Sequence, residues 1–269
     1  MKIIDAHLHF APGSYFNEIA LAAGHENSAA HLKKCYAELG IERGIVMSNL
    51  TLNPEELIYP EFLSYCIGLD NSTWSESDWK RNLALIEENL RRPECVGIKL
   101  YPGYLHFYVS DDSLTPLYRL AEKYDKPVAV HTGLTAMSRA LLKYSHPMVL
   151  DEAAAKFPEV RFVMCHLGEP LIADAAAVLM KNHNVSADLS GMLEKKIPDI
   201  DSYIAHDKFY IDQLRGWLEL LDDYSRIMFG TDWPLANLSD YIEFVKAFIP
   251  SDQWEQVFYL SAKAIYFRN

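Results

Sequence analysis

The sequence predicts an α/β fold, a single (β/α)8 TIM barrel domain over residues 1–269. Eight short runs rich in β-branched and apolar residues alternate with amphipathic helical patterns. Parallel neighbouring strands need a crossover connection, so this alternation indicates a parallel sheet. The chain length fits the closure of eight such units. An open doubly wound sheet is the rival fold, but it usually has a glycine-rich phosphate loop after an early strand, where this chain has His-Leu-His.

The strands are expected in eight ranges. These are 2–9, 43–49, 62–69, 95–101, 126–132, 160–167, 184–190 and 226–232. The segment between the second and third strands has a weak helical pattern and predicts only a turn. Each of the other gaps predicts a helix that returns the chain for the next parallel strand.

The first helix has a clear apolar face and clear ends. The apolar face consists of Leu32, Cys35, Tyr36 and Leu39. Ser28 is the expected N-cap and Gly40 the C-terminal stop. Further helices are expected over 77–91, 113–124, 148–157, 170–182, 209–222 and 238–249. A last helix from Ser251 closes the chain.

Charge and composition exclude several classes of partner. The formal net charge of −12 argues against nucleic acid, which needs basic patches, and against an anionic membrane surface. No apolar run is long enough for a signal core or a membrane span. The four cysteines form no C-x-x-C pair, which indicates free thiols in a reducing compartment. We therefore expect a cytoplasmic protein with a small-molecule partner, either monomeric or a homodimer.

Two histidines lie one residue apart in the opening stretch MKIIDAHLHF. Residues i and i+2 of a strand point to the same face, so Asp5, His7 and His9 share one face. In a barrel this polar face points into the mouth, where two imidazoles are costly to bury without partners. A cation bound by both imidazoles is the favoured explanation, and two hydrogen-bonded core histidines are the alternative.

Three later strands also end in an ionisable residue followed by a turn signal. They are VAVHTG with His131, FVMCHLG with His166 and MFGTDWP with Asp232. The active site of this fold lies at the C-terminal ends of the strands, so these groups are expected at one rim with His7 and His9. The remaining histidines are expected on the solvated surface. They are His25, His31, His106, His146, His183 and His206.

This set of motifs resembles the amidohydrolase superfamily, and more closely its branch that contains aminocarboxymuconate semialdehyde decarboxylase with related decarboxylases and lactone hydrolases. The segments that carry the resemblance occur in the family's order. They are IDAHLH, GIKLYP, PVAVHTG, FVMCHLG and FGTDWP. Each segment alone is a weak signal, but all five in order are quite specific, and they cover the chain nearly from end to end.

The resemblance implies one divalent metal ion per chain, most often zinc, held by His7, His9, His131 and Asp232. It also implies that His166 is the catalytic acid or base. Zinc lowers the pKa of a bound water toward about 7. Asp232 is then placed to take the proton of that water, and His166 to polarise or protonate the substrate. Asp5 either holds a metal-binding histidine or caps backbone groups deeper in the barrel.

Lys99 has three possible roles. It shares a face of the fourth strand with Tyr101, in the stretch GIKLYPGY. An inward lysine near the barrel mouth is best suited to bind a substrate carboxylate. The alternatives are a carboxylated lysine that bridges two metal ions, as in other amidohydrolase branches, and a structural ion pair with Asp5.

Several neighbours of the rim motifs are further candidates for substrate binding. The aromatic loop after the fourth strand forms either a substrate wall or simple packing, through Tyr101, Tyr104, Phe107 and Tyr108. Residues that directly follow the rim motifs are Glu169 and Trp233, and Ser190 ends the seventh strand. Cys165 precedes His166 and is expected to face the helix layer as a small buried hydrophobe.

The sequence therefore predicts a metal-dependent hydrolase that acts on a small lactone or amide bearing a carboxylate. A non-oxidative, metal-dependent decarboxylase of an unsaturated or aromatic acid is the runner-up. A barrel that binds a metal or ligand without turnover is the non-enzymatic alternative. The presence of all five rim residues argues against that alternative, because a degenerate enzyme tends to lose one of them.

Overall fold

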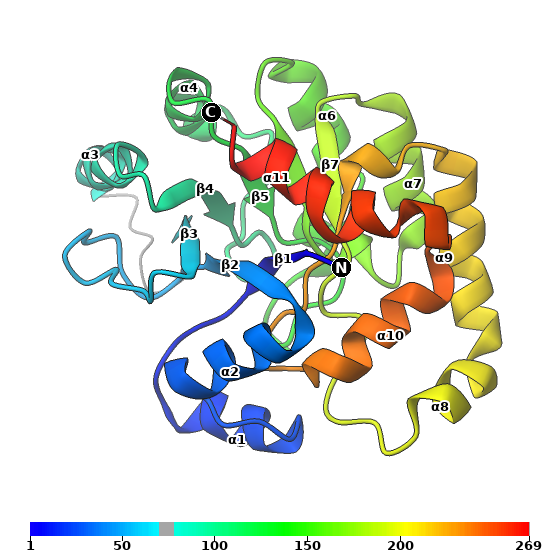
Figure 1. Ribbon diagram of the computed structural model, residues 1–269. Helices are drawn as coiled ribbons and strands as arrows, with labels where there is room; N and C mark the ends of the chain where they lie inside the picture. The colour runs from blue at the N-terminus through cyan, green and yellow to red at the C-terminus, as the bar shows by residue number, and fades with distance from the viewer. Residues whose placement is uncertain (70–77, 269) are drawn as a thin grey trace. The chain divides into compact units, whose positions relative to one another are not determined.

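The computed structural model describes residues 1–69 and 78–268. Its eight strands follow one another in the sheet in the order of the sequence. They are β1 (Ile3–Leu8), β2 (Ile41–Met47), β3 (Leu63–Leu69), β4 (Cys95–Leu100), β5 (Val128–Val130), β6 (Phe162–Met164), β7 (Val185–Asp188) and β8 (Ile227–Met228). The recorded pairings are parallel. The predicted (β/α)8 barrel is confirmed (Figure 1).

The helices lie in the gaps between the strands, as expected. They are α1 (Ser14–Ala22), α2 (Ala29–Leu39), α3 (Trp79–Leu90), α4 (Thr115–Lys123), α5 (Leu142–Ser145), α6 (Val149–Lys156), α7 (Ile172–Lys181), α8 (Ile200–His206), α9 (Lys208–Leu221), α10 (Leu238–Phe248) and α11 (Ser261–Tyr266). The closing helical segment begins with a 3-10 turn at Ser251–Gln253 and reaches α11 through a π-helical turn, Gln256–Leu260. Position 77, the expected start of α3, lies outside the described residues.

The ends of α2 follow the sequence prediction. The Ser28 side chain accepts a hydrogen bond from the backbone N–H of His31 and caps the helix. Gly40 ends it at φ 77°, in the left-handed region, and a Cβ there would lie 2.7 Å from the Met1 carbonyl oxygen. Helices α1, α5 and α8 were not predicted. Helices α5 and α8 are short, and α1 has Gly13 at its N-cap position, where no side chain is available to cap it.

Strands β5, β6 and β8 are shorter than the sequence suggested. They have 3, 3 and 2 residues, because the chain leaves the extended conformation before the predicted ends. A four-residue 3-10 turn, η3 (Cys165–Gly168), directly follows β6. The predicted functional residues at these ends therefore lie in turns, not on the strands themselves.

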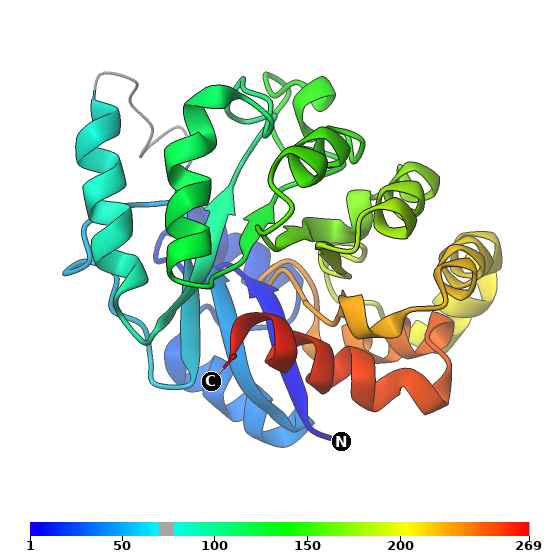
Figure 2. The same ribbon diagram turned by 90° about the horizontal axis from the view of Figure 1, so that it is seen from above.

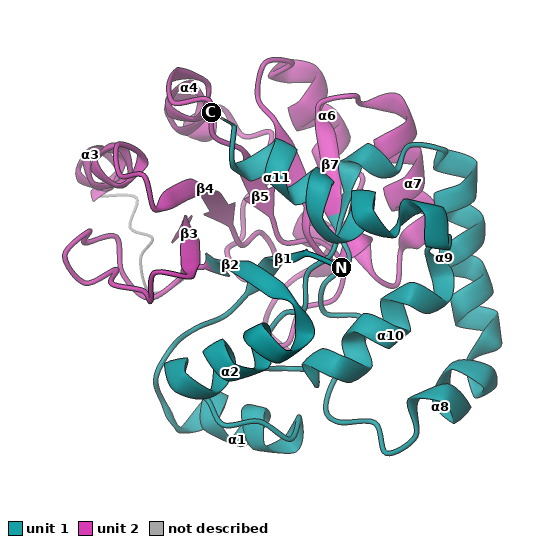
Figure 3. Cartoon of the chain, in the orientation of Figure 1, with its two compact units in different colours: residues 1–46, 188–268 teal, residues 47–187, 269 magenta. Residues whose placement is uncertain are grey.

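The chain divides into two compact units (Figure 3). Unit 1 comprises residues 1–46 and 188–268, with β1 and β8. Unit 2 comprises residues 47–187, with β3 to β6; in it, helices α3 and α4 run side by side (Figure 2). A single domain over 1–269 stays a prediction.

In unit 1, β8 and the turn after it lie along β1. The N–H of Ala6 donates to the Phe229 carbonyl at 3.0 Å, and the N–H of Asp232 donates to the His7 carbonyl at 2.8 Å. Gly230 permits this approach, since a Cβ there would lie 3.0 Å from the Cβ of His7. These contacts bring the side chains of His7 and Asp232 together, although 225 positions separate them in the sequence.

In unit 2, the turns after β5 and β6 pack tightly on one another. The N–H of His131 donates to the Leu100 carbonyl at 2.9 Å, which extends the β4–β5 pairing by one residue. Gly133 follows at φ 80°, and a Cβ there would lie 2.1 Å from the Glu169 carbonyl oxygen. A glycine is therefore required at this point for the two turns to meet.

Candidate active site

Three of the predicted metal ligands converge in unit 1. Nε2 of His7 lies 3.5 Å, and Nε2 of His9 3.3 Å, from the same carboxylate oxygen, Oδ1 of Asp232. His7 is fully buried and His9 is half-buried, with its ring stacked on Phe16. These three side chains, called here the strand cluster, have the spacing of ligands around one ion.

Asp188, at the end of β7, determines which nitrogen of His7 carries the proton. Its Oδ2 lies 2.9 Å from Nδ1 of His7, and both side chains are fully buried. A carboxylate accepts, so the neutral imidazole has its proton on Nδ1 and its lone pair on Nε2. Metal-binding histidines commonly have such a carboxylate partner. Sequence analysis missed Asp188; the stretch SADLS after a buried strand was the available signal.

Two roles were predicted for Asp5, holding a metal-binding histidine or capping backbone groups. Its hydrogen bonds are those of the second, structural role. Its carboxylate accepts from the N–H and the hydroxyl of Thr231, at 2.9 and 2.6 Å, and from the hydroxyl of Tyr36 at 3.0 Å. Burial raises the pKa of Asp5 to about 7, while the hydrogen bonds from Thr231, Tyr36 and the His7 N–H lower it. Asp5 thus ties β1 to α2 and to the turn after β8.

The other two predicted rim histidines meet in unit 2. Nδ1 of His131 lies 3.1 Å from Nε2 of His166, and both residues are buried. Nε2 of His131 lies 2.9 Å from the Leu134 carbonyl oxygen, which can only accept a proton. The neutral His131 ring therefore carries its proton on Nε2 and directs the lone pair of Nδ1 toward His166.

Two of the predicted catalytic residues adopt left-handed backbone conformations. His166 has φ 63° and Asp232 has φ 58°, values that are uncommon for residues other than glycine. Such backbone conformations cost about 1–3 kcal/mol each and tend to occur at functional sites. The turns that carry them aim these side chains in directions that a continued strand would not.

Lys99 is fully buried in unit 2. Its ammonium group contacts Sγ of Cys165 at 2.8 Å and lies 5.1 Å from the centre of the Tyr101 ring. Cys165 is buried, as expected, but the prediction that it faces the helix layer is wrong, because its thiol contacts Lys99. Strand β6 ends at Met164, so the alternation of faces that the prediction assumed no longer applies at Cys165.

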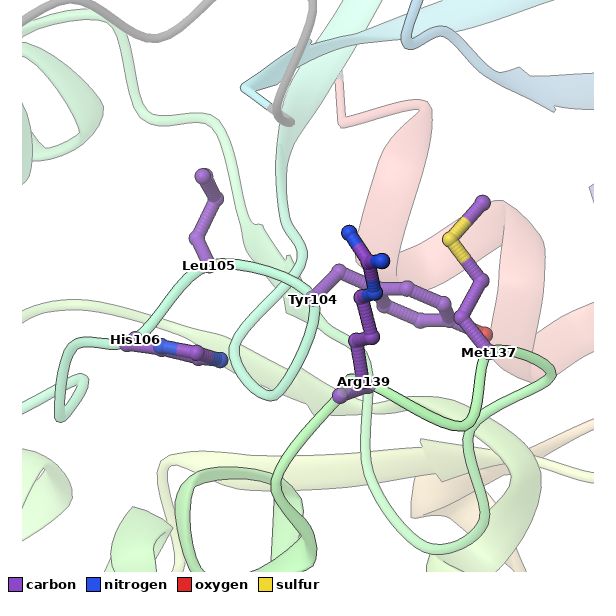
Figure 4. Close-up of a pocket in the computed structure, with 6 residues that line it drawn as sticks. Tyr104, Leu105, His106, Met137 and Arg139 are labelled. Carbon is purple, nitrogen blue, oxygen red and sulfur yellow. The ribbon is translucent and has the colours of Figure 1, made fainter.

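The aromatic residues after β4 divide into packing and pocket lining. Tyr101 is buried and its hydroxyl donates to the Met47 carbonyl at 2.9 Å, so it belongs to the packing. Tyr104 places its ring 5.0 Å from the ring of His131 and lines a pocket of 280 Å³ (Figure 4). His106 and Arg139 line the same pocket with exposed side chains. Arg139 was not predicted, although it is a cation in a loop that directly follows a rim motif.

The remaining predicted substrate-binding residues are buried or half-buried. Glu169 is half-buried, and its backbone carbonyl accepts from the Leu134 N–H at 3.0 Å. Trp233 is fully buried, with its ring centre 4.7 Å from that of His25. Ser190 is buried and its hydroxyl donates to Asp188. Their contact with substrate stays a prediction.

Three histidines that were expected on the solvated surface are half-buried, namely His25, His31 and His146. Nδ1 of His25 lies 3.0 Å from Nε2 of His31, and the ring centre of His31 lies 6.3 Å from that of Trp233. The prediction was wrong because the helix period shows which face a residue occupies but not which distant residue covers it. The four cysteines all lie in the described part of the chain, and none of them forms a disulfide, as expected.

The chain belongs to the amidohydrolase family, whose model matches residues 4–268. It is therefore an enzyme of the amidohydrolase superfamily, as its motifs indicated. Among curated proteins, it is 24% identical over 189 residues to Protein fluG of Emericella nidulans. That match covers 70% of this chain but only 20% of the relative.

Several solved structures share the fold. An uncharacterised TIM-barrel protein from Bordetella bronchiseptica has a TM-score of 0.72 at 22% identity and covers 98% of each chain. A 2,6-dihydroxybenzoate decarboxylase from Rhizobium has a TM-score of 0.68 at 17% identity and covers 99% of this chain and 98% of its own. A putative 2-pyrone-4,6-dicarboxylic acid hydrolase from Pseudomonas putida has a TM-score of 0.65 at 16% identity, covering 98% and 97%. Hydrolases and decarboxylases thus both occur among these proteins.

The helices of the described residues do not include a candidate membrane span. None combines the length and the apolar character that crossing a bilayer requires.

Proposed function

We propose that this enzyme is a metal-dependent hydrolase of a small lactone or amide that bears a carboxylate. The observation that carries the proposal is the convergence of His7, His9 and Asp232 on a single point in unit 1. We propose that His131 completes the ligand set and that His166 lies beside it in the same site. The substrate is a small molecule, and no nucleic-acid or membrane partner is expected.

The chemistry of the strand cluster fits a divalent cation. The proton of His7 is on Nδ1, so its Nε2 lone pair points at a carboxylate oxygen 3.5 Å away. Two electron-rich atoms that face each other in a buried site need a cation or a shared proton between them. Imidazole nitrogens together with a carboxylate suit zinc. When bound, the metal supplies Lewis acidity, which lowers the pKa of a water molecule and polarises a carbonyl group.

The protein's own groups then have separate roles. Asp232 accepts the proton of the attacking water, since its carboxylate is held beside both imidazoles of the strand cluster. His166 donates its Nε2 proton to the substrate in place of Nδ1 of His131, the acceptor that it faces in this structure. Nδ1 of His131 is thereby left as the nitrogen that can act as a ligand. Asp188 keeps the His7 ring in the orientation and tautomer that binding requires.

Two cations of unit 2 support an anionic substrate. Lys99 is buried at the end of β4, and Arg139 lines the pocket beside Tyr104. Tyr104 in turn contacts the His131 ring, so the pocket adjoins a predicted metal ligand. A substrate carboxylate offsets the cost of a lysine near a bound cation and orients the reacting carbon. A carboxylated Lys99 that bridges two ions is the alternative.

A non-oxidative decarboxylase is the second candidate. It is favoured by the buried His131–His166 pair, because such a reaction must deliver a proton to a carbon atom before carbon dioxide leaves. The same ligand set serves either reaction, so the products decide between them.

The test combines metal analysis with a substrate screen. We expect about one zinc ion per chain after dialysis, and hydrolysis of carboxylated lactones or amides in preference to neutral ones. Protein that holds no metal after expression with added zinc would contradict the metal site. Release of carbon dioxide without ring opening would move the enzyme to the second candidate.

A further inference from the structure

A second group of potential metal ligands lies in unit 1 at the start of α2. It consists of His25, His31 and Cys35, and is called here the helix cluster. His31 and Cys35 are four residues apart on α2, so they lie on one face of the helix. His25 comes from the turn before α2, and all three side chains are half-buried. None of these residues has a role in the proposed hydrolysis.

The donor atoms have the separations of ligands around one ion. Nδ1 of His25 and Nε2 of His31 are 3.0 Å apart, and Sγ of Cys35 lies 3.3 Å from the latter and 4.0 Å from the former. Tetrahedral zinc with bonds of about 2.0–2.3 Å places its ligand atoms roughly 3.3–3.6 Å apart. The observed distances bracket that range, so binding requires shifts of only a few tenths of an ångström.

We propose that the helix cluster is a second metal site, which binds a soft divalent cation of the zinc class through two imidazoles and one thiolate. Thiolate and imidazole together select zinc-like ions over magnesium or calcium. Three protein ligands leave one coordination position for water, which is the arrangement of an exchangeable site and not of a closed structural site. This inference is independent of the proposed hydrolysis.

The protonation of His25 and Cys35 defines what binding must change. Burial, with smaller effects from His31 and Lys196, lowers the pKa of His25 to about 4, so its ring is neutral and able to bind metal. Burial raises the pKa of the Cys35 thiol, so the ion must displace the thiol proton, which leaves to solvent. The thiolate that remains has one negative charge, which neutralises one of the two positive charges of the ion.

A hydrogen bond at the start of α10 competes with the metal. The N–H of Leu238 donates to Nε2 of His25 at 3.2 Å, so without metal the proton of His25 is on Nδ1 and points to His31. Binding moves that proton to Nε2, where it faces the Leu238 N–H. The metal-free tautomer is thus favoured by one hydrogen bond. We therefore expect weaker binding here than at the strand cluster, where His7 already has the required tautomer.

The site also adjoins the predicted active site through one side chain. The buried Trp233 ring packs on both His25 and His31. Trp233 follows Asp232 directly, and its carbonyl accepts from the His9 N–H at 2.6 Å. An ion at the helix cluster would therefore fix the orientation of the Trp233 ring. The backbone of Trp233 is joined to Asp232 and hydrogen-bonded to His9, two members of the strand cluster.

The test uses Co²⁺, because a thiolate ligand produces a charge-transfer band in the near ultraviolet that imidazole and carboxylate ligands do not. Protein loaded with one equivalent of zinc, which fills the tighter strand cluster, is titrated with Co²⁺. The expected result is a thiolate band that saturates at one further ion per chain. The band should be lost in Cys35→Ser and His31→Gln, and kept in His183→Gln, which removes an exposed histidine of unit 2.

A second measurement on the unaltered protein covers the case in which a variant fails to fold. Zinc should protect Cys35 from alkylation by iodoacetamide, as mapped by mass spectrometry of its peptide. Absence of the band in the unaltered protein, its persistence in Cys35→Ser, or alkylation of Cys35 that zinc does not slow would each overturn the proposal. Loss of catalytic activity plays no part in this readout, so failure here leaves the proposed function untouched.

Discussion

The strand cluster and the helix cluster are built from similar ligands in different ways. Each has two histidines and one group that is anionic or can become so. In each, the ligand atoms lie within 4.8 Å of one another. In the strand cluster, Asp188 fixes the proton of His7 on the nitrogen that faces away from Asp232. In the helix cluster, Leu238 fixes the proton of His25 on the nitrogen that faces His31.

The difference indicates that the hydrogen-bond partners of the ligand histidines decide whether those histidines already have the tautomer that metal binding requires. A carboxylate that accepts from one imidazole nitrogen leaves a lone pair on the other nitrogen, which can bind a cation. A backbone N–H that donates to an imidazole instead stabilises the tautomer that metal binding must change. The following predictions test this contrast, from the largest expected effect to the smallest.

The largest effect is expected for His7→Ala. The variant removes a buried ligand that Asp232 and Asp188 both contact, so the strand cluster should lose its metal and the enzyme its activity. Elemental analysis after dialysis, together with turnover, measures both losses. His183→Gln is the matched control. Variant protein that still holds one ion per chain would show that His7 is not a ligand.

A large effect on turnover alone is expected for His166→Asn. Loss of a general acid or base should reduce kcat by roughly 10²-fold or more, while the metal content stays near that of the unaltered enzyme. The comparison with His7→Ala separates the two roles. If His166→Asn strips the metal as completely as His7→Ala, the role assigned to His166 is wrong.

An intermediate effect is expected for Asp188→Asn, which tests the contrast directly. The neutral amide is a weaker acceptor than the carboxylate for the Nδ1 proton of His7. The zinc affinity should therefore fall by about 10- to 100-fold. Competition with a chromophoric chelator measures the affinity. Ser190→Ala is the control, since it leaves the Asp188–His7 contact in place. Equal zinc affinity in Asp188→Asn and the unaltered enzyme would remove the proposed reason for the contrast.

The smallest effects are expected at the two cations assigned to the substrate. Lys99→Met should raise KM by about 10-fold with less change in kcat, because a charged hydrogen bond to the substrate forms in ground and transition states alike. Arg139→Gln, at an exposed position, should raise KM by about 5-fold or less. Steady-state kinetics with carboxylated and neutral substrates measures both. An unchanged KM in Lys99→Met would refute its contact with the substrate carboxylate.

Most of the fold could be read from periodicity. All eight strands were located, and the ends of α2 at Ser28 and Gly40 were correct. The ends of β5, β6 and β8 were not, because left-handed turns at residues such as His166 follow no simple residue preference. That error in turn misplaced Cys165, which contacts Lys99 instead of facing the helix layer.

The sequence by itself determined which residues are candidates for the proposed chemistry. Period-two spacing placed His7 and His9 on one face, and strand-end motifs selected His131, His166 and Asp232, because these signals are local and repeat with the backbone geometry. Only the tertiary structure decided which distant groups meet them. Asp188 behind His7, Arg139 beside Tyr104, and Trp233 over His25 and His31 are contacts between segments far apart in the chain. No local pattern encodes them, because each depends on packing that exists only after the strands have paired.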